Sequence, residues 1–409
     1  MTQVLDAPAV PLRRNHAFQL LWAGSAFTFL GVQVADLVYP LVVLAVTGSA
    51  AWAGAFGGVQ LFVALLVGLP AGVLADTHDR RRLLILVEAV RVVATASVVV
   101  AVVADAVTLP HLLAVAAVVG AVQPVGGSAR MLLVRAVVPP RQLTSALTQE
   151  EVRSHAAALG GPPLGGLLYA VALVLPFAVT AASFAVSLVC ALFLRVPPRS
   201  GPPPARAAGD RVIDGLALLW RTPTLRYGTL FAAALNMVLA PLVLVVIVLL
   251  QRDGATPAMV GLTVAGLAVG GLVGTPLVGP LHRWLSPGAL MLWLGGTGVV
   301  LVAALALPFG AWWLAVALFL LGLGGPAMRV LVDILIFRQV PDEQRGRAVT
   351  AFMTVLGAGA SLGMVTSGLL LENLSATAAL LTLSGVLALA LCVSAADRRI
   401  RSATWPAEG

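Results

Sequence analysis

The sequence has few charged residues, no lysine and only two cysteines. Charged residues make up 10% of the chain and aromatic residues 6%. A soluble domain carries about 25% charged residues, so this chain cannot cover a water-facing surface. A soluble enzyme, a nucleic-acid-binding domain and a disordered chain are therefore excluded. Cys190 and Cys392 lie in separate apolar runs, which excludes a disulfide framework and a cysteine metal site.

The chain is instead dominated by apolar residues. Of its 409 residues 60% are hydrophobic, and the mean hydropathy is +1.01. At about 20 apolar residues per membrane crossing, this composition suffices for about twelve spans. The predicted spans are 17–46, 50–75, 83–104, 109–134, 143–169, 172–195, 223–250, 257–281, 286–307, 311–337, 347–371 and 375–396. The sequence thus predicts an all-α integral membrane protein.

The arginines predict how the chain is oriented. All 25 basic residues are arginine. With the N-terminus inside, 20 of them fall in cytoplasmic connections or at the cytoplasmic ends of spans, four fall deeper within spans, and Arg252 alone falls outside. Such an asymmetry follows the positive-inside rule. It predicts a multi-pass protein of a bacterial cytoplasmic membrane, with both termini in the cytoplasm.

The longest connection divides the chain into two halves. It begins VPPRSGPPPARAAG and continues DRVIDGLALLWRTP, in which apolar residues recur at helical spacing. We expect an N-terminal six-helix half at 1–195, a cytoplasmic proline-rich linker with an amphipathic helix at 196–222, and a C-terminal half at 223–409. The halves repeat weakly: a shift of 206 places Pro70 on Pro276. Duplicated halves are typical of secondary transporters.

The connection after the second span carries a specific motif. Residues 68–84 read GLPAGVLADTHDRRRLL, which resembles the signature of the major facilitator superfamily, although Thr77 stands where that family usually has a basic residue. The resemblance implies twelve transmembrane helices in two pseudo-symmetric six-helix halves. It also implies a cytoplasmic gate, in which the glycine permits close helix packing. The gate residues would be Gly72, Asp76, Arg80, Arg81 and Arg82.

The fifth span contains GPPLGG, which resembles the antiporter motif of the same superfamily. Its residues are Gly161, Pro162, Gly165 and Gly166, among others. Tight packing, as in any polytopic protein, is the alternative reading. Three further segments, TGSA, VPPRQLTSA and GLALLWRTPTLR, are similar to the branch that contains the enterobactin exporter and macrolide-efflux-like transporters.

Ionisable residues within spans are candidates for proton or substrate binding, because a charge in hydrocarbon is costly. Asp36 lies one turn after Gln33 in the first span, and a structural hydrogen bond is its alternative role. Glu88 and Arg91, three residues apart, are expected to form a structural ion pair. Arg130 has no partner nearby on its own helix. Its partner could be Asp36 or Glu151, or it could bind an anionic substrate.

The remaining candidates lie in the fifth, seventh and tenth spans. Glu151 and His155 share one helix face, and histidine titrates near neutral pH. The alternative to a functional role is that these polar residues lie at a solvated end of a helix or form structural hydrogen bonds and ion pairs. The candidates are Glu151, His155, Asn236, Arg329 and Asp333.

Together these features predict a proton-coupled exporter of small amphipathic, drug-like, natural-product or siderophore molecules, working by alternating access. The expected partners are protons, the small-molecule substrate and the bilayer, with no nucleic acid, cofactor or metal, and the chain is expected to be a monomer. A proton symporter or uniporter that imports a nutrient is the first alternative. A membrane sensor or enzyme is the second, although no Walker-type phosphate loop is present.

Overall fold

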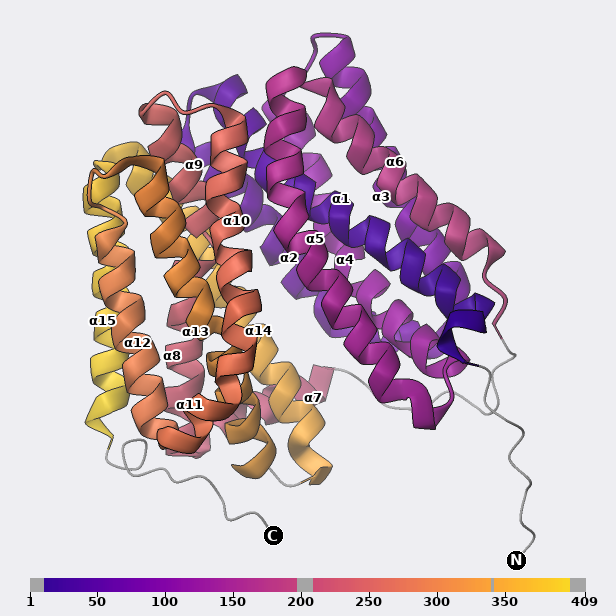
Figure 1. Ribbon diagram of the computed structural model, residues 1–409. Helices are drawn as coiled ribbons and strands as arrows, with labels where there is room; N and C mark the ends of the chain where they lie inside the picture. Colours follow the sequence, from indigo (N-terminus) through magenta and orange to yellow (C-terminus); the bar gives the residue numbers. More distant parts are fainter. Residues whose placement is uncertain (1–10, 197–208, 340–341, 398–409) are drawn as a thin grey trace, which may run out of the picture.

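The chain folds into helices arranged as two bundles (Figure 1). The computed structural model describes residues 11–196, 209–339 and 342–397. Within these ranges the side chains of residues 69, 209–213, 223–224, 332–339 and 342–346 are not described. The described residues contain helices and turns and no β-strand.

The N-terminal bundle consists of six long helices, each within a few residues of a predicted span. Serine, aspartate and asparagine caps begin several of them: Ser49 accepts a hydrogen bond from the Trp52 amide, and Asp79 from the Arg82 amide. The helices are α1 (His16–Thr47), α2 (Ala50–Thr77), α3 (Arg80–Val103), α4 (Leu109–Val137), α5 (Leu143–Val171) and α6 (Val174–Phe193), with short 3-10 turns η1 (Leu12–Arg14) and η2 (Pro140–Gln142).

The C-terminal bundle repeats this pattern with two interruptions. The seventh span divides at Pro241 and the eighth at Pro276, because proline lacks the amide hydrogen and clashes with the preceding turn. The segments are α8 (Pro223–Leu239), α9 (Leu242–Arg252), α10 (Pro257–Gly274), η3 (Thr275–Leu277), α11 (Val278–Trp284), α12 (Pro287–Ala304), α13 (Gly310–Gln339), α14 (Asp342–Asn373) and α15 (Ala376–Ala396).

Eleven segments of the described chain are long and apolar enough to cross a membrane. The helix α5 falls short of this hydropathy, because its first half reads LTSALTQEEVRSH and its middle is rich in glycine and proline. It is nevertheless 29 residues long and packs between α1 and α10. Counting α5, the described residues form twelve transmembrane helices in two pseudo-symmetric halves.

One end of the molecule carries the connection between the halves. The start of α1, the end of α15 and the amphipathic helix α7 (Gly209–Arg221) lie at this end, at the bottom of Figure 1. We call it the linker face, and the opposite end the far face. The helix α7 packs against α14: Leu219 is buried, and Arg347 pairs with Asp214 at 3.1 Å.

The two halves meet near the far face and diverge toward the linker face (Figure 1). Their contacts run between α2 and α14 and between α5 and α10. Near the far face, the Ser361 hydroxyl donates to the Gly58 carbonyl at 3.0 Å. Closer to the linker face, a Cβ atom added to Gly68 or Gly72 would have no neighbour within 4 Å. The halves are therefore closed at the far face, and α2 and α14 separate toward the linker face.

Candidate functional site

A buried ionic network holds the N-terminal half together. Glu88 of α3 is fully buried, and its Oε1 accepts from Arg130 at 2.7 Å, Thr28 at 3.1 Å and Arg91 at 3.4 Å. The Arg91 guanidinium also lies over the Phe184 ring, 5.6 Å from its centroid. Side chains from α1, α3, α4 and α6 thus converge on one carboxylate.

This network corrects the expected partner of Arg130 and adds to the expected Glu88–Arg91 pair. Arg130 pairs with Glu88, and not with Asp36 or Glu151 as the sequence suggested. The Glu88–Arg91 pair is present at 3.4 Å, as the three-residue spacing predicts. The sequence could not show that α4 brings a second arginine to the same carboxylate, because that contact depends on how α3 and α4 pack.

Asp36 is another carboxyl in a span of the N-terminal half, and its environment differs from that of Glu88. It is exposed and lines a pocket of about 20 Å³ together with residues of α2, α3, α4 and α6, among them Gln60 and Thr95. Among the described residues, no basic side chain lies within 4.0 Å of its carboxylate. Asp36 therefore faces the bundle without a described basic side chain beside its carboxylate.

The GPPLGG segment lies where α5 crosses both α1 and α10. Gly161 packs directly against Gln33 of α1, and Gly166 against the backbone of Pro257 in α10, so a Cβ atom at either glycine would overlap its neighbour. Despite Pro162 and the proline after it, α5 runs unbroken from Leu143 to Val171. The described geometry assigns these glycines to close helix crossing near the far face.

An ion pair joins the halves on the side of the linker face. The Arg329 guanidinium of α13 lies 3.8 Å from the Glu151 carboxylate of α5, and both side chains are exposed. His155 lies one turn further along α5 and is also exposed. The side chain of Asp333, the candidate four residues after Arg329, lies outside the described residues.

The Asn236 side chain makes a hydrogen bond within its own helix. Its side-chain amide donates to the Ala232 carbonyl of the preceding turn at 3.3 Å. This bond is the structural alternative considered for it. The amide oxygen remains available for other contacts, since only the nitrogen is used.

Polar contacts also close the far face. Glu372, at the end of α14, accepts from the Ser49 hydroxyl at 3.0 Å and from the Ala51 amide at 3.3 Å. The carboxylate thus sits at the N-terminus of α2, where a negative charge is favoured. Arg252 donates to the Leu371 carbonyl at 3.0 Å, which anchors the same end of α14.

Sequence reasoning missed this closure. The serine before α2 is recognisable as a helix cap, but its partner lies 323 residues away. No local pattern links the two positions, because the contact exists only where the halves meet.

The loop between α2 and α3 differs in detail from its expected role. Gly72 is exposed and has open space beside it, so the prediction that it permits close helix packing is wrong for this conformation. Asp79, and not Asp76, caps α3. Arg81 donates to the Ala191 carbonyl at 3.3 Å and the Leu192 carbonyl at 2.6 Å, and so neutralises the last turn of α6.

Comparison with known proteins places the chain in a family. The sequence model of the Major Facilitator Superfamily matches residues 21–311 and 229–408. The "Multidrug efflux pump Tap" of Mycobacterium tuberculosis (strain ATCC 25618 / H37Rv) is 26% identical over 388 residues, or 91% of this chain and 90% of that protein. The "Uncharacterized MFS-type transporter YfiS" of Bacillus subtilis (strain 168) is 25% identical over 331 residues, or 78% and 77%.

Solved structures share the fold at lower identity. The crystal structure of the nucleoside transporter NupG has a TM-score of 0.75 at 13% identity and covers 92% of this chain and 98% of that one. A bacterial homologue of the human lysosomal transporter Spinster, in an inward-facing and unoccupied conformation, has a TM-score of 0.73 at 16% identity and covers 97% and 100%. With its family match, its helical halves and its membrane spans, the chain is a multi-pass membrane transporter, and not an enzyme, of the major facilitator superfamily.

Proposed function

We propose that this transporter is a proton-coupled exporter of small amphipathic molecules, with its linker face in the cytoplasm. The observation that carries the proposal is Asp36, a carboxyl within a span that no described cation neutralises. Such a group is costly as a carboxylate in a membrane and is relieved by a proton or by a cationic substrate. Binding of one can therefore release the other, which is the exchange an antiporter needs.

The contrast with Glu88 supports this choice of coupling residue. Two arginines and a threonine donate to one oxygen of Glu88. The arginines balance its negative charge, so breaking these contacts is costly. Asp36 has no such partner within the described part of the chain and is exposed. Of the two acids, only Asp36 can exchange its ligand without breaking a buried ionic network.

Alternating access fits the asymmetric contact between the halves. The far face is closed by Glu372 on the start of α2, and the linker face is open (Figure 1). With the positive-inside orientation, this is an inward-facing state. For export, the Glu372 contact must then break while the linker face closes, and the exposed Glu151–Arg329 pair is positioned to tighten as it does.

The similarity to a named multidrug efflux pump supports export of lipophilic compounds over import. It covers about nine-tenths of both chains at 26% identity. Drug-like and natural-product molecules, siderophores included, form the substrate class that we propose for this chain.

Proton flux in inverted vesicles tests the proposal. Wild-type protein is challenged with a panel of amphipathic compounds while a pH-sensitive dye reports the lumen. Asp36→Asn is compared with Asp105→Asn, which changes an exposed aspartate in the turn between α3 and α4. We expect compound-dependent proton release from wild type and from Asp105→Asn, and none from Asp36→Asn.

The other results have definite meanings. Undiminished proton release from Asp36→Asn would show that Asp36 does not couple protons to transport. Glu151 and His155 would then be the candidates for that role. Proton movement in the same direction as the compound would identify a symporter. Compound movement without protons would identify a uniporter.

A further inference from the structure

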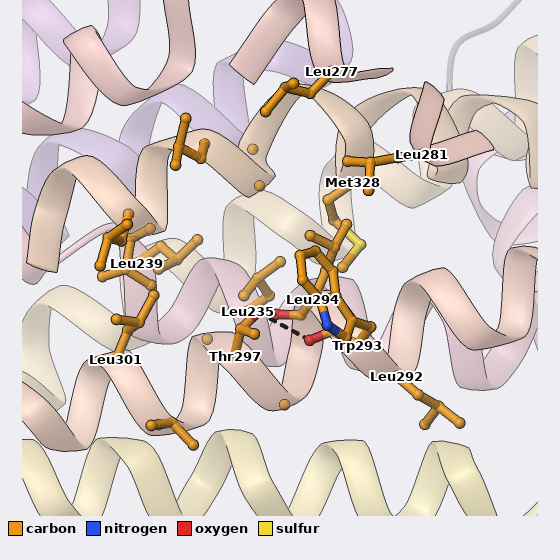
Figure 2. Close-up of a pocket in the computed structure, with 18 of the residues that line it drawn as sticks. Leu235, Leu239, Leu277, Leu281, Leu292, Trp293, Leu294, Thr297, Leu301 and Met328 are labelled. Carbon is orange, nitrogen blue, oxygen red and sulfur yellow. Dashed lines mark hydrogen bonds between the residues drawn. The ribbon is translucent and has the colours of Figure 1, made fainter. Parts of the chain in front are cut away.

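The C-terminal half contains an apolar pocket that is separate from the site described above. Its volume is about 850 Å³, and α8, η3, α11, α12 and α13 form its walls. Figure 2 shows leucine, tryptophan and methionine side chains from these elements arranged around it. The hydroxyl in its described lining belongs to Thr297 and donates to its own helix, to the Trp293 carbonyl at 2.9 Å and the Leu294 carbonyl at 3.0 Å. The pocket therefore suits a hydrocarbon ligand.

The pocket lies where the two halves differ in sequence. Pro124 in α4 and Pro326 in α13 lie 202 residues apart, in the fourth and tenth spans, and the same shift places Met328 where α4 has Gly126. A Cβ atom on Gly126 would lie 2.9 Å from a methyl carbon of Val87, so α3 and α4 pack closely at this point. In the C-terminal half Met328 stands at that position and lines the pocket. The helices α12 and α13 still contact each other one turn away, where a Cβ atom on Gly324 would lie 3.0 Å from a methyl carbon of Leu294.

The pocket opens toward the membrane. Trp293 is 52% exposed and Val300 is 65% exposed, although both lie in the spanning helix α12. This helix packs on α11, α13 and α15, all in its own half. Its exposed face therefore borders the bilayer, and not the space between the halves.

The depth of the pocket corresponds to one leaflet. Its lining on α12 extends from Leu292 to Leu301, which at 1.5 Å per residue is about 14 Å. That is about half of the roughly 30 Å hydrocarbon core. At the linker-face end lie Trp284, 80% exposed, and the exposed Arg283, residue types that favour the headgroup region and anionic lipids.

We propose that this pocket binds one acyl chain of an anionic phospholipid from the leaflet at the linker face, with the headgroup beside Arg283. The chain would fill the space that α3 and α4 close by direct contact in the other half. The site uses no residue assigned to proton or substrate binding, so this proposal does not depend on the transport proposal.

Photo-crosslinking in proteoliposomes tests the site. The probe is phosphatidylglycerol with a diazirine in one acyl chain, added at a low fraction to phosphatidylcholine, and the labelled peptides are mapped. We expect labelling concentrated several-fold in the pocket segments of α12 and α13 over other membrane-facing segments.

Two substitutions fill the pocket without disturbing close contacts. A Cβ atom on Gly296 or Gly325 meets nothing within 4 Å, so Gly296→Leu and Gly325→Leu should fold and project into the pocket. Each should lower its labelling several-fold. The matched control is Gly385→Leu in α15, which also has open space but does not line the pocket, and it should leave labelling unchanged.

The headgroup contact has its own variant. Arg283→Gln should reduce the preference for phosphatidylglycerol over a phosphatidylcholine probe of the same chain. Arg135→Gln, which alters an exposed arginine near the linker-face end of α4, should not.

Three results would overturn the proposal. One is even labelling along all membrane-facing helices, which would indicate only surrounding lipid. Another is undiminished labelling in both filled variants. The third is displacement of the lipid probe by tetraphenylphosphonium, together with labelling of the pocket by a photoreactive form of that cation, which would make it a site for lipophilic compounds.

Discussion

Replacing Glu88 by glutamine is expected to destabilise the N-terminal half by about 3–5 kcal/mol. The amide keeps the size of the carboxylate but removes its charge. Two arginines would then remain close together in the protein interior with no anion between them. The same change elsewhere in the chain should cost far less, which makes the prediction specific to this network.

The magnitude follows from the distances. At an effective dielectric constant of about 20, the Arg130 contact at 2.7 Å corresponds to about 6 kcal/mol and the Arg91 contact at 3.4 Å to about 5 kcal/mol of attraction. Desolvation of the carboxylate offsets a large part of this sum. What remains on breaking the network is the cost of leaving buried cations unpaired, which mutational data place at about 3–5 kcal/mol.

Companion variants separate charge balance from packing. Arg130→Met leaves one carboxylate with one arginine, Arg91, so it should cost less than half as much as Glu88→Gln. The double variant Glu88→Gln/Arg130→Met should be more stable than Glu88→Gln alone, because it removes one unpaired cation. A double-mutant cycle on these two positions gives their coupling energy.

Equilibrium unfolding in mixed detergent micelles, followed by circular dichroism, measures these differences. Asp214→Asn is the matched control, since it makes the same kind of change to an exposed ion pair with Arg347 at 3.1 Å and should cost less than about 1 kcal/mol. The reasoning is refuted if Glu88→Gln costs no more than this control, or if Arg130→Met is the more damaging change.

Three other substitutions test the contacts between and within the halves. Glu372→Gln removes a charge from the start of α2 and should shift the population away from far-face closure by about two- to fivefold, measured as spin-label distances across that face. Gly166→Val should abolish transport while the protein still inserts, because its side chain meets the Pro257 backbone. Gly160→Val, with open space, is its control in the same transport assay. Arg81→Met should increase hydrogen exchange at the end of α6, whose last carbonyls it binds.

Much of the architecture could be predicted because hydrophobic span length is a local property. A run of apolar residues must form a helix in a bilayer, where every backbone group needs an internal partner. The predicted spans accordingly agree with the helices within a few residues. The proline at 241 and that at 276 were visible too, but whether a proline bends or divides a helix depends on its neighbours, and Pro40 and Pro70 leave α1 and α2 continuous.

The candidate site was predictable only in part. Periodicity correctly paired Glu88 with Arg91, since both lie on one helix face. It could not find the partner of Arg130, which lies 42 residues away on another helix. The difference between Glu88, whose Oε1 contacts two arginines, and Asp36, which has no described cation beside it, likewise depends on packing.

The sequence by itself determined the class of protein, its spans, its two halves and the residues rare enough in hydrocarbon to be candidates. Each of these depends on composition or on spacing along one helix. Only the tertiary structure decided which face is closed, that Glu372 binds the start of α2, that Gly72 faces open space, and that Met328 lines a pocket. These features depend on distances between helices, which the packing of side chains far apart in the chain sets.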